Sequence, residues 1–241
     1  RKARSRVRSL SPLLKNLMKF SLTSSANMKN VLKYAFTGLL SLMVSLTYAQ
    51  DTALLDRLYD DFSSKLITLK FSYVIEMATS DMTGEGTVSF QDSQYRLSAN
   101  GLEVYCDGKD IWMVDSNSKE VIVEPVTEDA SAFMQNPAML FTGLKDNFEV
   151  VKVSEGGHVR EPGVKDVVFT LRPTVECGIE ECDIQIRKNG DLYYGTFIMS
   201  DDQVDIVRVL VNSITRSEKR SIDHFRPDQS FDSSWIVTDL R

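Results

Sequence analysis

The sequence predicts an α+β fold made mainly of antiparallel strands, with about eleven strands, one long helix and one broken helical insert. The main evidence is the stretch 84–126, where apolar and polar residues alternate in about five short runs. Each break carries turn residues, at Asp92-Ser93, Asn100-Gly101, Asp107-Gly108 and 115–118. Short strands joined by tight turns form a meander, so we expect a continuous sheet with one apolar face.

Residues 28–49 have the pattern of a secretory signal peptide. Residues 28–33 are basic, residues 34–46 are apolar, and residues 47–49 form a small-x-small cleavage box. As a helix the apolar part would span only about 20 Å, short of the ~30 Å hydrocarbon core, which argues against a membrane anchor. We therefore predict export by the Sec route, with residues 50–241 as a single domain and residues 1–27 as a disordered upstream extension.

The exported part of the chain is strongly acidic. Residues 1–49 contribute nine of the 28 Lys and Arg and none of the 34 Asp and Glu, so residues 50–241 carry a net charge of −15. Such a surface repels nucleic acid and anionic headgroups, and we expect neither as a partner. The first cysteine is Cys106, far from the cleavage box, whereas a bacterial lipoprotein needs its acylated cysteine directly after the signal.

The first helix is predicted at residues 51–69, because apolar residues recur there every three or four positions. Asp51 or Thr52 can cap its start. The apolar stripe consists of Leu54, Leu55, Leu58, Phe62, Leu66 and Leu69. An amphipathic helix must bury its apolar side against another element, and the sheet that follows is the obvious candidate.

The predicted sheet starts at Lys70, and its apolar face continues from strand to strand. The residues assigned to this face are Phe71, Tyr73, Ile75, Met77, Val88, Phe90, Tyr95, Leu97, Val104 and Cys106. In the next strand Ile111 and Met113 oppose Trp112 and Val114, which predicts burial on both sides, and Val121 and Val123 end the run. One reading of this face is an ordinary core under one helix. Its breadth argues against that reading, because one helix cannot cover it.

Residues 127–145 interrupt the strand rhythm with a broken helical insert. Asn136-Pro137 divides it into two parts, and the two sides carry Phe133, Met134, Met139, Leu140 and Phe141. Flexible Met and Phe side chains can repack around ligands of varying shape. The insert could equally be a crossover segment that plugs one end of the core, and the spacing alone leaves both readings open.

The remaining chain returns to strand patterns separated by turns. Strands are predicted at 148–153, 167–171, 181–187, 193–200, 204–213 and 235–238. Turns are predicted at 80–84, 156–157, 161–163 and 188–191.

Catalytic chemistry has little support in the sequence. The two histidines, His158 and His224, fit no triad or metal spacing, and no nucleophile elbow, phosphate loop or dinucleotide motif is present. Cys106 fits a buried small hydrophobe, while Cys177 and Cys182 could form a short-loop disulfide in an oxidising compartment. We therefore expect a binding or carrier protein without cofactor or metal, not an enzyme.

Several motifs, in order, resemble one family. Residues 106–115 are similar to a D-G-x-x-(L/I)-W strand pair, and Gly84-x-Gly86 precedes a Phe/Tyr-rich strand. The end of the chain, at 225–227 and 237–241, is similar to a tail of the form F-x-P…V-x-D-L-R. These features resemble LolA, the periplasmic outer-membrane lipoprotein carrier of the LolA/LolB superfamily. One departure is Asp92-Ser93, where the family often has the Arg-Pro of its lid switch. Arg96 is the candidate substitute.

The resemblance implies an incomplete, half-open β-barrel of about eleven strands wrapped around the N-terminal helix and a helical lid insert. It also implies a periplasmic chaperone that binds the acyl chains of lipoproteins in a hydrophobic cavity and moves them from the inner to the outer membrane. The implied partners are acylated lipoproteins, an inner-membrane lipoprotein-releasing ABC transporter and, where the host has one, an outer-membrane acceptor. We expect a monomer. The alternative is a related half-barrel that binds another lipid or senses the state of the envelope.

The predicted ligand site combines the apolar sheet face with the insert. Its residues are Phe71, Tyr73, Ile75, Met77, Val88, Phe90, Tyr95, Leu97, Ile111, Met113, Phe133, Met134, Met139, Leu140 and Phe141.

Overall fold

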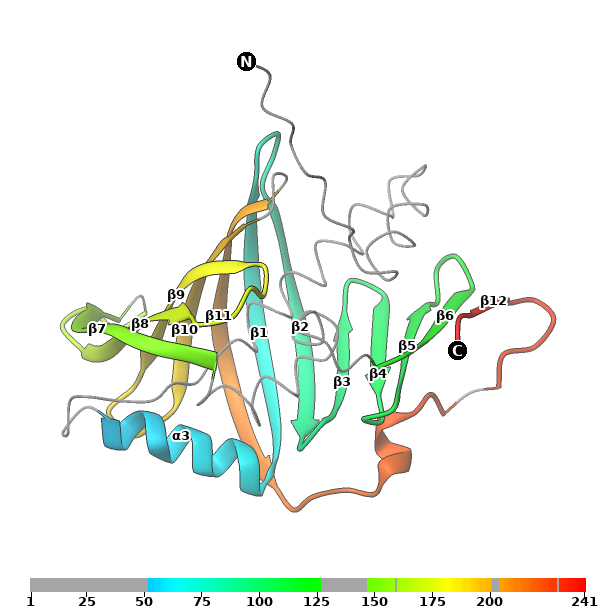
Figure 1. Cartoon of the computed structure of the whole chain (residues 1–241), viewed down its shortest axis with the longest axis horizontal. Coiled ribbons are helices and arrows are strands. Elements are labelled where there is room, and N and C mark those ends of the chain that lie inside the picture. The colour runs from blue at the N-terminus through cyan, green and yellow to red at the C-terminus, as the bar shows by residue number, and fades with distance from the viewer. Residues whose placement is uncertain (1–51, 127–146, 159, 201–203, 229) are drawn as a thin grey trace.

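The computed structural model describes residues 52–126, 147–158, 160–200, 204–228 and 230–241. Within these ranges the chain forms one α-helix, α3 (Thr52–Ser64), and one twelve-stranded sheet (Figure 1). The strands are β1 (Leu66–Met77), β2 (Met82–Gln91), β3 (Gln94–Ala99), β4 (Leu102–Cys106), β5 (Asp110–Asp115), β6 (Glu120–Pro125), β7 (Phe148–Gly157), β8 (Lys165–Pro173), β9 (Ile179–Ile186), β10 (Leu192–Met199), β11 (Val204–Ser217) and β12 (Ile236–Asp239).

The sheet is open, and its pairing is almost entirely antiparallel. Its strand order is β12-β6-β5-β4-β3-β2-β1-β11-β10-β9-β8-β7, so β12 and β7 form the two edges. Only the pair β12–β6 is parallel. The prediction of a mainly antiparallel, incompletely closed sheet with an N-terminal helix is confirmed. The helical lid insert lies outside the described residues, as do the signal peptide and the preceding extension.

Strand β1 is the central element, and it begins earlier than the sequence pattern suggested. It pairs with β11 from Leu66 onward and with β2 from Ile67 onward. The predicted helix end at Leu69 is therefore wrong, because Leu66 and Leu69 belong to the strand. Leu69 fits both the helical and the strand period, so periodicity alone could not assign it. The side chains of Ser63 and Ser64 donate to the carbonyl of Asp60 in the last turn of α3, where the helix ends.

Most of the predicted turns are confirmed by the backbone. Asn100, with φ 51°, and Gly101, with φ 82°, adopt the left-handed conformation of a two-residue hairpin turn. Gly108, with φ 93°, does so in the Asp107-Gly108 turn. The predicted turn at 156–157 is wrong, because β7 runs through to Gly157, and the one at 80–84 is shifted, because the β1–β2 turn lies at 78–81 and β2 begins at Met82. In both places glycine was taken as a turn signal although it lies within a strand.

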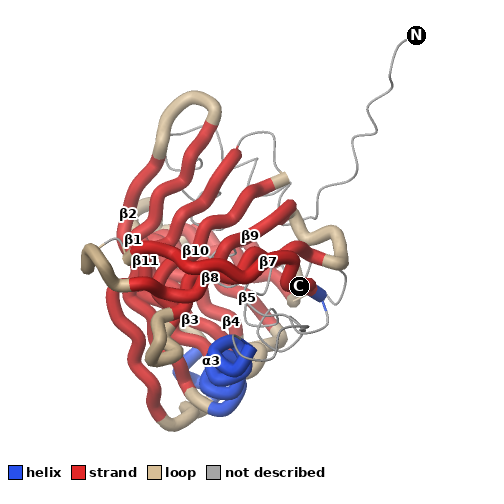
Figure 2. The backbone as a smooth tube through the Cα atoms, turned by 90° about the vertical axis from the view of Figure 1, so that its left-hand side faces the viewer, coloured by secondary structure: helices blue, strands red, loops and turns tan. Residues whose placement is uncertain are grey.

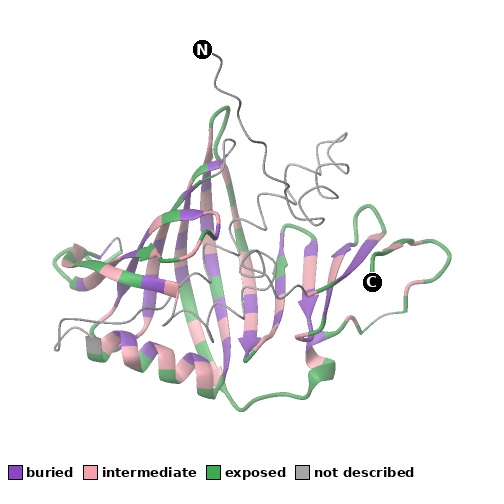
Figure 3. Cartoon of the chain, in the orientation of Figure 1, coloured by how far each residue is buried: buried purple, intermediate pink, exposed green. Residues whose placement is uncertain are grey.

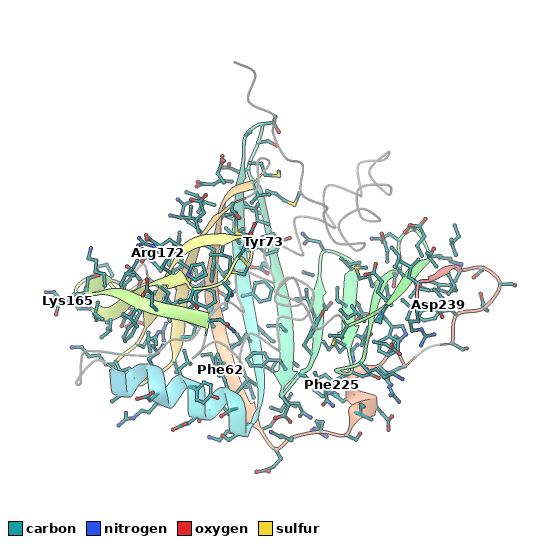
Figure 4. All side chains as sticks on the ribbon, in the orientation of Figure 1. Phe62, Tyr73, Lys165, Arg172, Phe225 and Asp239 are labelled. Carbon is teal, nitrogen blue, oxygen red and sulfur yellow. The ribbon has the colours of Figure 1, made fainter. Side chains whose placement is uncertain are left out.

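Burial divides the sheet into two faces (Figure 3). We call the face against which α3 packs the inner face and the opposite one the outer face. The inner face carries the large apolar cluster, to which α3 contributes Leu55, Leu58 and Phe62. The ring of Phe62 meets that of Phe90 edge-on at 5.1 Å, between the helix and the sheet (Figure 4).

The outer face carries a smaller apolar cluster over β4, β5 and β6. Its buried members are Tyr105, Val114, Val121 and Val123, and Trp112, Phe231 and Trp235 pack against them. Strand β5 is thus buried on both sides, as predicted from its sequence. The cover comes from the C-terminal segment, which includes a 3-10 helix at Ile222–Phe225 against β3 and ends in β12.

Candidate functional site

The structure places the predicted site residues of the sheet on the inner face and in one cluster. Phe71, Tyr73 and Ile75 lie along β1, and Met77 and Met113 are partly buried against the same cluster. Val88 and Phe90 of β2, Tyr95 and Leu97 of β3 and Ile111 of β5 complete the set. The predicted site residues of the insert, Phe133, Met134, Met139, Leu140 and Phe141, lie outside the described residues.

Strand register aligns these side chains in rows across the sheet. One row runs from Val88 through Leu97, Val104 and Met113 to Ile122. The next row runs from Phe90 through Tyr95, Cys106 and Ile111 to Glu124. Because both rows are apolar from β2 to β5 without a gap, the inner face of these four strands is one continuous apolar surface.

Two glycines explain how the largest rings of β1 fit on this surface. A Cβ atom at Gly86 would lie 2.7 Å from Cζ of Phe71, and one at Gly84 would collide with the hydroxyl of Tyr73. The Gly84-x-Gly86 motif therefore leaves room on β2 for rings that project from β1. The hydroxyl of Tyr73 accepts a hydrogen bond from the amide of Asn100, and burial raises the pKa of this tyrosine. The sequence motif thus reflects ring packing on the inner face.

The second half of the inner face was not included in the predicted site. It consists of buried side chains of β8 to β11, which belong to the same apolar cluster as the predicted residues. They include Phe169, Leu171, Ile184, Ile186, Phe197, Val207 and Val209. Period-two alternation was visible in each of these strands, but only the fold shows that they share a face with β1 to β5.

One carboxylate lies in the apolar rows and was missed by sequence reasoning. Glu124 is 4% exposed, and the register of β6 places it next to Ile111 on the inner face. Burial, together with the nearby Cys106 and Glu124, raises the pKa of Tyr95 well above its ordinary value. The alternation of β6 puts Val121 and Val123 on the outer face, so they do not continue the inner surface.

Arg96, the candidate substitute for the lid-switch arginine, lies on the outer face, and its relation to the insert is outside the described residues. Its guanidinium is 3.2 Å from Glu103 and lies 4.8 Å above the ring of Tyr105, a member of the outer cluster. The physical reason is strand alternation, since Tyr95 and Leu97 on either side of Arg96 both point inward.

The Asp107-Gly108 turn anchors the C-terminal segment. The carboxylate of Asp107 accepts hydrogen bonds from the backbone N–H groups of Lys109 and Asp110, both at 2.9 Å, and from Arg226 at 2.7 and 2.8 Å. Burial acts to raise the pKa of Asp107, but these donors outweigh it and hold the pKa below its ordinary value. Arg241 contacts Asp110 at 3.1 Å. The motif residues of the turn and the tail therefore form one structural unit.

The three cysteines are free thiols, and all are buried. Burial raises the pKa of Cys106 to about 12, with smaller contributions from Asp107 and Asp110 against a hydrogen bond from Gly108. Burial also raises the pKa of Cys177 and Cys182. A thiol must ionise to act as a nucleophile, so none of the three is activated for that role. The described residues contain no group of three or more side chains suited to hold a metal ion.

No helix within the described ranges is long and apolar enough to cross a membrane. No family model matches the sequence, and no curated protein sequence matches it.

Several solved structures are similar in fold at low sequence identity. An uncharacterized conserved protein from Thermus thermophilus is 12% identical, with a TM-score of 0.48 over 78% of this chain and 98% of that one. A LolA superfamily protein from Nitrosomonas europaea is 8% identical, with a TM-score of 0.38 over 73% and 97%. MucB is 14% identical, with a TM-score of 0.41 over 79% and 66%.

Proposed function

We propose that this protein is a periplasmic carrier that binds the acyl chains of lipoproteins on the inner face and moves them from the inner to the outer membrane. The observation that carries the proposal is the extent of the inner face compared with its described cover. The apolar cluster reaches from β5 across β1 to β7, whereas α3 is the only helix on this face within the described residues.

A simple comparison of dimensions supports this point. A helix of 13 residues is about 20 Å long and about 10 Å wide. Twelve strands spaced about 4.8 Å apart make a sheet roughly 50 Å across, before curvature is considered. The helix alone can therefore cover only a minor part of the apolar rows. The side chains of these rows are nevertheless buried, so in this account the ligand takes the place of part of their cover.

The energetics of acyl chains explain why such a protein is needed. Burial stabilises each CH₂ group by about 0.8 kcal/mol, so a sixteen-carbon chain in water costs roughly 12 kcal/mol. A lipoprotein with several chains cannot cross an aqueous compartment unaided. In this account an ABC transporter of the inner membrane loads the carrier, and release at the outer membrane requires a movable cover. The carrier acts as a monomer and performs no catalysis.

Mass spectrometry of the protein purified from its own periplasm tests the proposal. We expect bound acylated lipoprotein in the wild type and in Ser98→Glu, because Ser98 is exposed. Met113→Glu places a carboxylate on the inner face at a partly buried position, so it should be empty while remaining folded. Equal loading of both variants, or a wild type that is always empty, would contradict the proposal. A bound amphiphile without protein would favour the alternative of a lipid-binding or envelope-sensing half-barrel.

A further inference from the structure

A polar site lies on the outer face, beneath the β7–β8 hairpin and apart from the apolar rows. Arg160, near the tip of this hairpin, donates to the side chain of Asn212 on β11 at 2.6 Å. The side chain of Gln185 on β9 donates to the carbonyl of Gly157 at 3.1 Å. The hairpin is therefore held across the outer face of β9 to β11, and Figure 2 shows it crossing in front of them.

Three side chains meet under this hairpin. The ring of His158 stacks on that of Tyr193 at 4.0 Å, with 14° between the ring planes. The guanidinium carbon of Arg187 lies 4.6 Å from the centre of the same tyrosine ring. A register shift between Leu192 and Tyr194 gives the tyrosine its position, because the ladder with β9 is interrupted there. Tyr193 is fully buried, and the side chain of His158 is 2% exposed.

Each of the three side chains has a buried polar atom without a hydrogen-bond partner. These atoms are Nδ1 of His158, the hydroxyl oxygen of Tyr193 and Nε of Arg187. Leaving such an atom unpaired costs about 1–3 kcal/mol, so native proteins rarely keep several together. All three belong to groups that contact one ring, that of Tyr193, so they lie in the same part of the outer face.

The chemistry of these atoms defines the class of ligand. Nε of Arg187 can only donate, the hydroxyl of Tyr193 can donate, and Nδ1 of His158 can donate when it carries a proton. Arg187 takes part in no ion pair within the part of the chain that the structure describes. Donors beside an uncompensated guanidinium call for an oxygen-rich anion.

The neighbouring acids do not fill this role. Asp166 is buried and accepts a hydrogen bond from Gln185 at 3.0 Å. Glu161 lies 3.9 Å from Nε2 of His158, on the far side of that ring from the unpaired Nδ1, and its side chain is 61% exposed. Glu161 therefore lies against the other ring nitrogen and leaves Nδ1 without a partner.

We propose that His158, Arg187 and Tyr193 form a binding site for a small oxyanion of the phosphate class, either free phosphate or the phosphate ester of a lipid headgroup. The net charge of −15 over residues 50–241 repels an anionic membrane surface as a whole, so the site takes a single oxyanion, not a membrane. The site is on the outer face, so it is independent of acyl-chain binding on the inner face.

Nuclear magnetic resonance of the histidine ring signals tests this proposal directly. The chain has only two histidines, so His224→Gln assigns the signals, and His224 serves as an internal control in the wild type. Inorganic phosphate and glycerol 3-phosphate are titrated separately against the full mature chain at constant pH and ionic strength. Both should shift the His158 signals saturably if the site takes headgroup esters, and only phosphate should do so if it takes the free ion.

Three variants separate binding from folding. Tyr193→Phe removes only the hydroxyl and keeps the stacked ring, and it should weaken the affinity about five- to tenfold. Arg187→Gln should abolish saturation. Arg172→Gln is the matched control, because Arg172 lies on β8 and pairs with the partly exposed Glu181 at 2.8 Å (Figure 4), and it should bind like the wild type. Absence of a saturable shift with either probe, or equal binding by all variants, would overturn the proposal and leave the three atoms to ordered water.

Discussion

Replacement of Asp107 by alanine should destabilise the fold by about 3 kcal/mol. The side chain of Asp107 is 2% exposed and accepts two backbone hydrogen bonds, from Lys109 and Asp110, in addition to two from Arg226. Alanine leaves both backbone donors without a partner and removes the ion pair that joins the C-terminal segment to the β4–β5 turn. The prediction therefore tests the structural reason for the Asp107-Gly108 motif.

The magnitude follows from the two kinds of donor. Each backbone hydrogen bond contributes about 1 kcal/mol, and loss of both accounts for about 2 kcal/mol. The guanidinium of Arg226 is 46% exposed, so water compensates it after the change and its pair contributes only about 1 kcal/mol more. Glu181→Ala removes another carboxylate–arginine pair, that with Arg172, and should cost less than about 1 kcal/mol.

The loss of stability caused by removing the Asp107 carboxylate should also depend on pH. The pKa of Asp107 in the folded protein lies below its ordinary value of 3.8, so the folded state favours the charged form. The Asp107 carboxylate therefore stabilises the fold fully above its unfolded-state pKa, and this stabilisation is lost as the pH falls through its folded-state pKa. We expect the stability difference between wild type and Asp107→Asn to be constant near neutral pH and to shrink below pH 3.8.

Urea unfolding followed by circular dichroism measures these differences in stability. We expect the substitutions to shift the midpoint of unfolding and to leave the m-value unchanged. A double-mutant cycle with Arg226→Ala isolates the coupling between the two side chains. If Asp107→Ala costs no more than Glu181→Ala, the turn does not anchor the tail and the reasoning is refuted.

Three further predictions concern the inner face and its surroundings. Gly86→Val should destabilise the protein by about 1–3 kcal/mol in urea unfolding, because its Cβ would lie 2.7 Å from the ring of Phe71; a neutral effect would show that the ring is free to move. Phe133→Asp or Leu140→Asp should abolish lipid binding and leave the circular dichroism of the sheet unchanged, whereas loss of folding would support a plain core. Cys106 should resist iodoacetamide in the native protein and react in urea, since burial raises its pKa to about 12; rapid native labelling would contradict this.

The first half of the sheet could be predicted because its information is local. Turn residues such as Asn100-Gly101 mark where each strand ends, and period-two alternation identifies the inner side chains. The same local reasoning failed where two patterns overlap, as in Leu69, and where glycine serves packing instead of a turn, as in Gly84. Both errors have the same cause, since one residue type can serve two structures.

Other features depend on contacts between distant parts of the chain and could not be predicted. The parallel pairing of β12 with β6 brings the last residues beside a strand more than a hundred positions earlier. The burial of Glu124 is set by strand register, although its charge suggests an exposed position. The site at His158 needs a hairpin to fold over a bulge at Tyr193, and no spacing in the sequence indicates that arrangement.

Site-specific photo-crosslinking in the living host tests the central claim most directly. A photoreactive amino acid is placed at Met113, on the inner face of β5, or at the adjacent Trp112, on its outer face. The account predicts an adduct with acylated lipoprotein from position 113 and none from position 112. Adducts from position 112 alone, or none from either position while the protein is expressed and folded, would contradict it.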